Sequence, residues 1–471
     1  MAGLSRLNCL RMKAAGVECV SAITCVAISV VWVAGVVPCE AEMRQHWPGF
    51  RGYRASGVGV GAATPAVWNV ATGMNVQWRS AVPGLGHSCP VIWGDRIYVT
   101  SAVRSSGEAS LKTGLYGDIA SVEDETSIRW MLYCYDRRTG DLHWERLVFE
   151  GRPRVKRHTK ASHANSTPAT DGRYVVSFFG SEGLVCFDMA GREIWRKDLG
   201  MLDSGYFAVS TAQWGFGSSP VIHEGRVIVQ CDVQGQSFVA SYRIADGQEI
   251  WRTDRDEVPT WGTPTVDVTR GTGQVILNGY RHIGAYALED GQPLWWLKGG
   301  GDIPVPTPVV SDGLVFITNS HGRMRPIYAI RLDAEGDISH DPSGSAEPHV
   351  AWSRRKGGNY MQTPIVVGGF LHTCTDGGVY ASYAVATGKR TARRRLSINA
   401  GYTASPVSGG GMLYFTAETG EVVVLSSDGE GAELAVNSLG EACLATPAIA
   451  DGMLVFRGRH HLIAIAEDGK R

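Results

Sequence analysis

The chain has 471 residues and a formal net charge of −1, so its composition gives no reason to expect nucleic-acid binding. Charged residues make up 19% and apolar residues 44%, which suits a globular protein with a large buried core. The 59 glycines favour a fold made mostly of strands and tight turns.

Residues 1–41 have the pattern of a secretory signal peptide. Three cations come first, and an uncharged apolar run follows over residues 20–37. Cys39 and Ala41 then place small residues at the two positions that a signal peptidase inspects. We expect cleavage after Ala41. Retention as a membrane anchor is the alternative, because the apolar run is long enough to span a bilayer. The protein is therefore expected to be exported, and to be periplasmic or envelope-associated.

Residues 42–471 are expected to consist of one repeated four-stranded unit. Its clearest copy is residues 219–252, where runs rich in Val, Ile, Phe and Tyr alternate with turns at Glu224-Gly225 and Asp246-Gly247. This is the composition of short antiparallel strands joined by hairpins. Four such strands in about 34 residues make one blade of a β-propeller.

A proline that opens the first strand of the unit recurs eight times, at Pro90, Pro168, Pro220, Pro264, Pro308, Pro364, Pro406 and Pro447. Repeats of about 40 to 45 residues with four strands per copy are typical of a propeller. The innermost strand of a blade lacks a partner on its channel side. Proline has no N–H to donate, so a sheet tolerates it at the start of such a strand.

The end of the unit is marked by a glycine followed four residues later by a tryptophan, at Gly140/Trp144, Gly191/Trp195, Gly247/Trp251 and Gly291/Trp295. In the fifth copy an insertion separates Gly336 from Trp352. The sixth copy has Ala392 at the tryptophan position, and the seventh keeps only Asp428-Gly429.

The eighth copy lacks its fourth strand, because the chain stops at Arg471. A spare strand, residues 76–79, contains Trp78 and precedes the first copy. We predict that this strand completes the last blade. The fold class is then all-β, an eight-bladed propeller of four-stranded antiparallel blades closed by its own two ends.

Three segments depart from the repeat. The first blade carries a polar insertion, residues 104–129, between its second and third strands, and the fifth carries another, residues 333–350. The run from Arg152 to His158 connects two blades and is interpreted as the only cationic cluster in the chain. We expect a solvated loop there, with a site for an anionic partner as the alternative.

These residues resemble the bacterial PQQ-like β-propeller repeat proteins over about residues 46–471. The resemblance is carried by WPGFRG, by the blade endings DRRTGDLHW and IADGQEIW, and by NSTPATDGRYVV, RDEVPTWGTP and LATPAIADGMLVFRGRHHLIAI. The last three stretches are similar to the exported, non-dehydrogenase branch, of which the BamB-type outer-membrane assembly propellers are examples. The resemblance implies a non-catalytic envelope scaffold that binds a protein or peptide.

The same resemblance raises two alternatives. One is a quinoprotein dehydrogenase, which uses pyrroloquinoline quinone (PQQ) and calcium and needs carboxylates, an aspartate base and, in that family, an adjacent Cys-Cys disulfide. The residue pairs just before the Ser, Thr or Cys that precedes each proline contain no acid, and no two cysteines are adjacent after the leader. We therefore expect no catalytic residue, no cofactor and no metal. The other alternative is a carbohydrate- or polymer-binding propeller.

The mouth of the central channel is the expected binding site, because a propeller places equivalent positions of its repeats on one ring. Aromatic rings with polar edges, next to amides, can hold extended chains at little entropic cost. Packing between blades is the alternative role for Trp214 and Trp261. We expect a monomer that binds no nucleic acid. The predicted partner-binding residues are His87, Asn165, Trp214, Trp261, Tyr360, Gln362 and Tyr402.

The leader generates a direct prediction. A reporter enzyme fused after Gln45 is expected to be active outside the cytoplasm, because the basic and apolar leader directs export. Reporter activity confined to the cytoplasm would contradict both the leader and an envelope role. Mass spectrometry of the mature amino terminus then distinguishes cleavage after Ala41 from retention.

Overall fold

The computed structural model describes residues 43–467 except 62, 115–118, 210, 272, 323 and 341–346. The predicted leader, residues 1–41, lies outside the described residues. Within them, no helix is both long and apolar enough to cross a membrane. The regular elements are strands and two short 3-10 helices, η1 (Tyr53–Ala55) and η2 (Gly180–Glu182).

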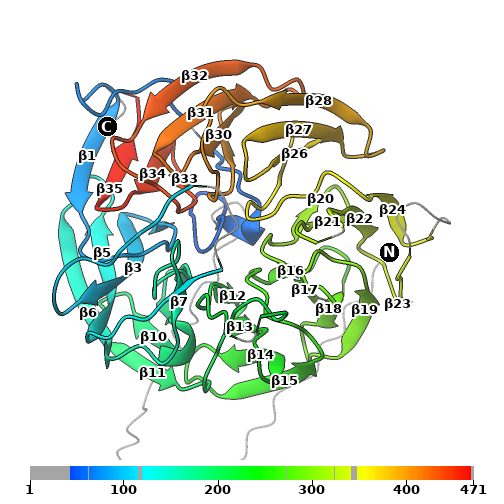
Figure 1. Ribbon diagram of the computed structural model, residues 1–471, viewed down its shortest axis with the longest axis horizontal. Coiled ribbons are helices and arrows are strands. Elements are labelled where there is room, and N and C mark those ends of the chain that lie inside the picture. Colours follow the sequence, from blue (N-terminus) through cyan, green and yellow to red (C-terminus); the bar gives the residue numbers. More distant parts are fainter. Residues whose placement is uncertain are drawn as a thin grey trace, which may run out of the picture. The chain divides into compact units, whose positions relative to one another are not determined.

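Eight antiparallel four-stranded blades surround a central channel, which confirms the predicted eight-bladed propeller (Figure 1). The innermost strands are β2 (Val91–Trp93), β8 (Ala169–Thr170), β12 (Val221–His223), β16 (Thr265–Asp267), β20 (Val309–Ser311), β25 (Ile365–Val367), β29 (Val407–Gly409) and β33 (Ala448–Ala450). The second strands are β3 (Arg96–Arg104), β9 (Tyr174–Phe178), β13 (Arg226–Cys231), β17 (Gln274–Leu277), β21 (Leu314–Thr318), β26 (Phe370–Cys374), β30 (Met412–Thr416) and β34 (Met453–Arg457).

The third strands are β5 (Ile128–Asp136), β10 (Leu184–Asp188), β14 (Ser237–Arg243), β18 (Ile283–Ala287), β22 (Ile327–Arg331), β27 (Val379–Ala384), β31 (Glu421–Ser426) and β35 (His461–Ile465). The outermost strands are β6 (Leu142–Gly151), β11 (Glu193–Lys197), β15 (Glu249–Arg255), β19 (Pro293–Leu297), β24 (Val350–Arg354), β28 (Arg390–Arg395), β32 (Glu433–Ser438) and β1 (Val76–Ala81). Blade 4 also gains β23 (Gly336–Asp337) from the insertion of the fifth copy, and this strand runs parallel to β19.

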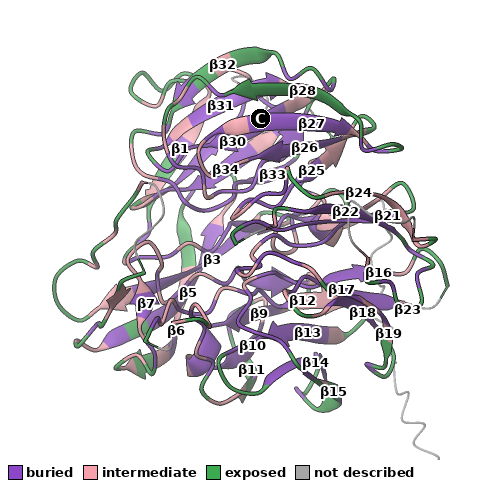
Figure 2. Cartoon of the chain, turned by 45° about the vertical axis from the view of Figure 1, so that its right-hand side comes forward, coloured by how far each residue is buried: buried purple, intermediate pink, exposed green. Residues whose placement is uncertain are grey.

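Burial falls from the middle of each blade to its outer edge. Both faces of a blade pack against neighbouring blades, so the second and third strands are nearly continuous apolar runs, as in β13 and β14. The outermost strands are largely exposed, and in β28 only the third residue is even half-buried (Figure 2). The core is therefore a set of layers between blades.

The glycine and tryptophan of the repeat join neighbouring blades. The Nε1 of Trp195, in blade 2, donates to the carbonyl oxygen of Ile244, in blade 3, at 2.6 Å. Gly247 of blade 3 lies against the same indole, where an added Cβ would come within 2.8 Å of the ring. Its φ of 71° also favours glycine. The two residues of the repeat thus belong to one joint between consecutive blades.

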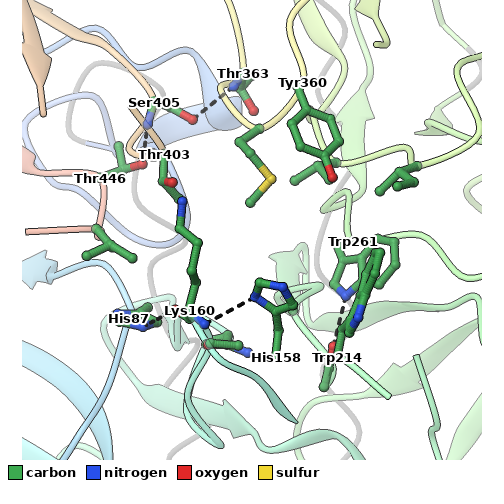
Figure 3. A pocket seen from close by; sticks show the side chains of 18 of the residues that line it. His87, His158, Lys160, Trp214, Trp261, Tyr360, Thr363, Thr403, Ser405 and Thr446 are labelled. Carbon is green, nitrogen blue, oxygen red and sulfur yellow. Dashed lines mark hydrogen bonds between the residues drawn. The ribbon is translucent and has the colours of Figure 1, made fainter. Parts of the chain in front are cut away.

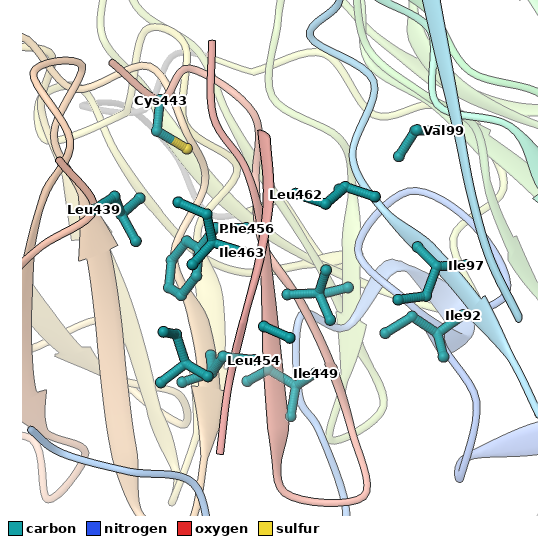
Figure 4. Close-up of a cluster of buried hydrophobic side chains, with 14 of the residues drawn as sticks. Ile92, Ile97, Val99, Leu439, Cys443, Ile449, Leu454, Phe456, Leu462 and Ile463 are labelled. Carbon is teal, nitrogen blue, oxygen red and sulfur yellow. The ribbon is translucent and has the colours of Figure 1, made fainter. Parts of the chain in front are cut away.

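The amino-terminal strand closes the ring, as predicted. β1 pairs antiparallel with β35, with Trp78 opposite Ala464. The indole of Trp78 then makes the same joint to blade 1, since Nε1 donates to the carbonyl of Arg137 at 2.8 Å and Gly140 lies against the ring. Buried side chains of blades 7, 8 and 1 form one hydrophobic cluster around this closure (Figure 4).

Blade 6 makes its joint without a tryptophan. Ala392 stands opposite Ser382 in the sheet. The hydroxyls of Ser382 and Thr391 instead donate to the carbonyl of Gly429, in blade 7, at 2.5 and 3.1 Å. Phe370 packs against the same glycine. Hydroxyls therefore replace the indole as donors at the joint between blades 6 and 7.

The insertion of blade 1 folds against the basic connector that was expected to be solvated. Strand β4 (Ser121–Val122) of the insertion pairs with β7 (Arg157–His158) of the connector. Arg157 is 1% exposed, and its Nε donates to Asp124 at 2.7 Å. The expectation of a solvated loop was wrong for this arginine, because the insertion supplies a carboxylate that compensates its charge.

Ring closure predicts the cost of truncating the joint. Trp78→Ala is expected to lower the free energy of unfolding by about 3–5 kcal/mol, as for other buried tryptophans. Trp251→Ala is the matched control, since the two side chains are 8% and 7% exposed and make equivalent joints. Thermal unfolding of both variants checks this. A melting temperature that falls for Trp251→Ala and stays unchanged for Trp78→Ala would contradict the closure.

Candidate functional site

Seven hydrogen bonds link the eight blades around the channel at the residue before each proline. The backbone N–H of this residue donates to the hydroxyl of its equivalent in the next blade, at 2.9–3.1 Å. At the eighth position, the thiol of Cys89 stands where the other blades have a hydroxyl, and its interaction with Thr446 opposes the rise that burial causes in its pKa. We call this ring of residues the hydroxyl belt; in order it contains Cys89, Thr167, Ser219, Thr263, Thr307, Thr363, Ser405 and Thr446.

On one side of the belt, residues 47–59 cross the channel (Figure 1). Arg51 is fully buried there and donates to the carbonyl oxygens of Pro364 and Pro406 at 2.8 Å each. Burial lowers the pKa of Arg51 to about 9, so the guanidinium stays charged at neutral pH. The neighbouring Phe50 lines the cavity on the other side. This segment therefore plugs one end of the channel.

The other side of the belt is a cavity of about 300 Å³ lined by three layers of residues (Figure 3). Belt residues form the deepest layer. The second layer is the residue two places before the belt in every blade, namely His87, Asn165, Gly217, Trp261, Val305, Met361, Thr403 and Leu444. The outermost layer comes from loops and from the short strand β7, and it contains Ile119, His158, Lys160, Tyr206, Trp214, His321 and Tyr360.

Five of the seven predicted residues line this cavity: His87, Asn165, Trp214, Trp261 and Tyr360. Gln362 and Tyr402 do not, which corrects their assignment to the mouth. Gln362 directly precedes the belt residue Thr363, and alternate side chains of an extended backbone point in opposite directions. The side chain of Gln362 therefore points away from the channel, and its amide donates to the carbonyl oxygen of Tyr402. Tyr402 is 1% exposed and packs in the core next to blade 7.

One side of the mouth is an arc of contacting rings, which we call the aromatic arc. Trp214 stacks on Tyr206 with ring centroids 6.0 Å apart and planes 7° apart. His321 meets the edge of Tyr206 at 5.6 Å and stacks on Tyr360 at 5.7 Å. Trp261 lies 5.8 Å from Trp214. The arc therefore runs from blade 3 to blade 6 as one continuous aromatic surface.

Hydrogen bonds fix the rings of the arc. Asp302 accepts from the hydroxyl of Tyr206 at 3.0 Å and lies 2.5 Å from Nδ1 of His321. Burial and the hydrogen bond to Asp302 raise the pKa of Tyr206, which keeps the phenol protonated. The Nε1 of Trp261 donates to the carbonyl of Gly215 at 2.8 Å. Rings held in this way lose little entropy when a ligand binds.

An ion pair faces the arc across the mouth. The ammonium of Lys160 and the carboxylate of Glu418 are in direct contact, with side chains 10% and 1% exposed. Both hold Gly114 of the blade 1 insertion: Nζ donates to its carbonyl at 2.9 Å, and its N–H donates to Glu418 at 2.8 Å. Burial lowers the pKa of Lys160, and Glu418 opposes this shift. The pair anchors the insertion at the mouth, and each charge compensates the other.

Burial keeps two further titratable groups of the cavity, His87 and Cys89, in their neutral forms. Burial lowers the pKa of His87 to about 3, so its imidazole is uncharged. Burial also raises the pKa of the Cys89 thiol, which removes the thiolate that nucleophilic chemistry requires. No described residue that lines the cavity is Asp or Glu. The geometry suits binding of a flat or extended ligand.

The loop residues of the arc were missed by sequence reasoning, apart from Trp214 and Tyr360. Tyr206 and His321 lie outside the proline-centred pattern, and nothing in their local sequence places them at the channel. The local sequence gives one weak signal. Gly205 directly precedes Tyr206 and Gly322 directly follows His321, and such glycines mark turns. The contacts of Lys160 with Glu418 join residues 258 positions apart.

Comparison with known proteins gives fold similarity at low sequence identity. No curated protein matches the sequence. The structure of a europium-containing methanol dehydrogenase has a TM-score of 0.59 at 11% identity, covering 90% of this chain and 90% of that chain. Quinohemoprotein alcohol dehydrogenase from Comamonas testosteroni gives 0.59 at 11%, covering 91% and 81%. BamB from Moraxella catarrhalis gives 0.50 at 13%, covering 78% and 98%. These similarities show the fold alone.

The family is shown by the sequence itself. The family model described as outer membrane protein assembly factor BamB matches residues 129–391. The match begins in the third strand of blade 1 and ends in the outermost strand of blade 6, so it covers more than half of the chain. The protein therefore belongs to this family of PQQ-like β-propellers.

Proposed function

We propose that the protein is an exported, non-catalytic propeller that binds an extended segment of a protein partner in the cell envelope. Membership of a family described as an outer membrane protein assembly factor supports an envelope role. The observation that carries the proposal is the aromatic arc, a fixed and continuous ring surface beside a cavity that is plugged at its other end.

The shape of the site favours part of a chain over a folded domain. A cavity of about 300 Å³ holds only a few side chains. The arc extends the contact surface from blade 3 to blade 6, so a peptide can insert one side chain towards the hydroxyl belt and lay its neighbours on the rings. Tyr and Trp provide large rigid contact areas for this purpose, and the amide of Asn165 adds a polar contact at the rim.

The donor atoms that line the cavity do not fit PQQ with calcium, the cofactors that the alternative of a quinoprotein dehydrogenase would require. Calcium takes six to eight oxygen ligands, mostly carboxylates and carbonyls. Glu418 and Asp302 contact lining residues but are already engaged, by Lys160 and by Tyr206 with His321. No group of three or more His, Cys, Asp or Glu in the described part of the chain could hold a metal ion. This supports a non-catalytic role.

Two ring truncations test the mouth as a binding site. Trp261→Ala and Tyr360→Ala are expected to weaken capture of the envelope partner about tenfold or more, as for anchors of an interface. Both side chains are only half-buried, so melting temperatures should stay nearly unmoved. The protein is used as bait in native envelope extract, and captured molecules are identified by mass spectrometry.

Tyr53→Ala is the control for these truncations, since Tyr53 is a half-buried ring in η1, in the segment that plugs the other end of the channel. It should capture the partner normally. If both mouth variants melt early, or bind as the wild type does, the mouth is not the site. Capture of a glycan in place of a protein would favour the carbohydrate-binding alternative.

Cofactor addition tests the non-catalytic role separately. Added PQQ and calcium are expected to give neither a stable bound spectrum nor alcohol-dependent dye reduction, because the lining offers no carboxylate for the metal. Absorbance titration and a dye assay with the full chain measure this. Stoichiometric binding accompanied by turnover would overturn the proposed function.

A further inference from the structure

A second concentration of positive charge lies on the flank of the propeller, and it corrects the view that the Arg152–His158 run is the only cationic cluster. Strand β28 reads Arg-Thr-Ala-Arg-Arg-Arg, and Trp352 of blade 5 is followed by Ser-Arg-Arg-Lys. The two runs are separated in sequence by the three inner strands of blade 6. The fold brings them together between blades 5 and 6.

These runs line a groove of about 660 Å³, which we call the basic groove. It shares no lining residue with the mouth cavity. Asp376 is the one acidic side chain among its described lining residues. The cations that line the groove are Arg325, Arg354, Lys356, Arg390, Arg393 and Arg395.

The single carboxylate of Asp376 does not balance the six cations of the basic groove. In the described part of the chain, none of the six cations forms an ion pair with a carboxylate. Arg354 and Arg395 donate to backbone oxygens instead, those of Gly388 at 3.1 Å and Gly377 at 2.8 Å. The Nε of Arg354 is buried without any hydrogen-bond partner.

Two arginines at the outer edge of blade 2, one in β11 and one in the turn before it, have carboxylate partners. In blade 2, Arg196 pairs with Glu193 at 2.5 Å and Arg192 pairs with Asp188 at 2.6 Å. The chain as a whole is almost neutral, with 45 Lys and Arg against 46 Asp and Glu. Six cations in one groove repel one another, and an anionic ligand would remove that repulsion.

The groove is long and has an apolar floor. Across the sheet, Arg393 lies opposite Ala381 and Arg395 opposite Val379, and both partners line the groove. Tyr383 continues the floor, with the guanidinium of Arg354 5.1 Å from its ring centroid. Along β28, the five-residue span of an extended strand separates the first and last arginines by roughly 16 Å. This length suits an extended chain better than a single small anion.

We propose that the basic groove binds an extended acidic segment of a partner protein. Arginine forks match carboxylates in a planar, two-point geometry, and the floor of Val379, Ala381 and Tyr383 receives the apolar side chains between the acids. The inference rests on the proposed function in one respect only, that the partner is a protein. The groove itself is independent of the mouth cavity.

A synthetic peptide tests the groove directly. The probe is a fluorescein-labelled peptide of four Glu-Val repeats, with a Gln-Val peptide as its neutral control, and binding to the full chain is measured by fluorescence anisotropy. The acidic peptide is expected to bind, with an affinity that falls as salt rises. Arg393→Glu combined with Arg395→Glu should weaken it about tenfold or more, since two charge-assisted contacts become repulsive.

A double variant elsewhere controls for net charge. Arg138→Glu with Arg192→Glu makes the same change at side chains 73% and 82% exposed, in blades 1 and 2, and should bind as the wild type does. Should charge reversal in the groove lower the melting temperature, Arg393→Gln with Arg395→Gln provides the same test with less repulsion. Trp261→Ala should leave peptide binding unchanged, which separates failure of the groove from failure of the mouth.

Three outcomes would overturn the inference. Equal weakening by the two Glu double variants would mean that only net charge matters. Equal binding of the Gln-Val peptide would remove the role of the carboxylates. Binding of polyphosphate or of anionic phospholipid vesicles, without binding of the acidic peptide, would assign the groove to a different class of ligand.

Discussion

The hydroxyl belt is the interaction on which the rest of the structure depends. The innermost strand of each blade has no neighbouring strand on its channel side, so a backbone N–H there would cost free energy if it stayed unpaired. The belt residue satisfies this N–H by donating it to the hydroxyl of the next blade. Its own hydroxyl accepts the N–H of the previous blade, so one residue acts as both donor and acceptor. The following proline has no N–H to satisfy. Seven such links fix the blades in register around the channel, and that register decides which residues face the cavity.

A second set of links acts at the outer radius, where the indole of one blade meets the glycine turn of the next. Blades 6 and 7 both lack the tryptophan in their outer strands, and its loss in blade 6 has a structural consequence. With Ala392 in place of an indole, the joint to blade 7 is made by two short hydroxyls, and β28 carries arginines on an exposed edge. Charged side chains on an edge strand oppose pairing with other strands. The same edge forms one wall of the basic groove, so the loss of the tryptophan and the gain of a charged surface occur in the same strand.

The fold was predictable because its constraints repeat. Eight prolines and the glycine-tryptophan spacing each mark a backbone requirement, and the missing strand of the last blade could be matched to the spare one around Trp78. The mouth was only partly predictable. The recurring prolines indicated which segment of each blade lies at the channel, but not which of its alternating side chains point into the channel. Gln362 was chosen in blade 6, whereas the residue that lines the cavity there is Met361, one position earlier. The arc depends on loops outside the repeat, and the Lys160–Glu418 pair joins distant parts of the chain. No periodicity carries that information.

The two proposed surfaces differ in whether their charged side chains have partners of opposite charge within the protein, and burial explains the difference. At the mouth, the buried ammonium of Lys160 is matched by the carboxylate of Glu418, because an uncompensated charge buried near the channel would be costly. On the flank, solvent screens the arginines of β28, so they can remain without partners until a ligand supplies the opposite charge. Binding at the mouth would therefore rest on shape and aromatic contact, and its affinity would depend little on salt. Binding in the groove would rest on charge, and its affinity would fall as salt rises. A partner that reached both would gain from the high effective concentration of its second contact. Such a partner needs acidic and apolar segments separated by enough chain to pass from the flank to the channel mouth.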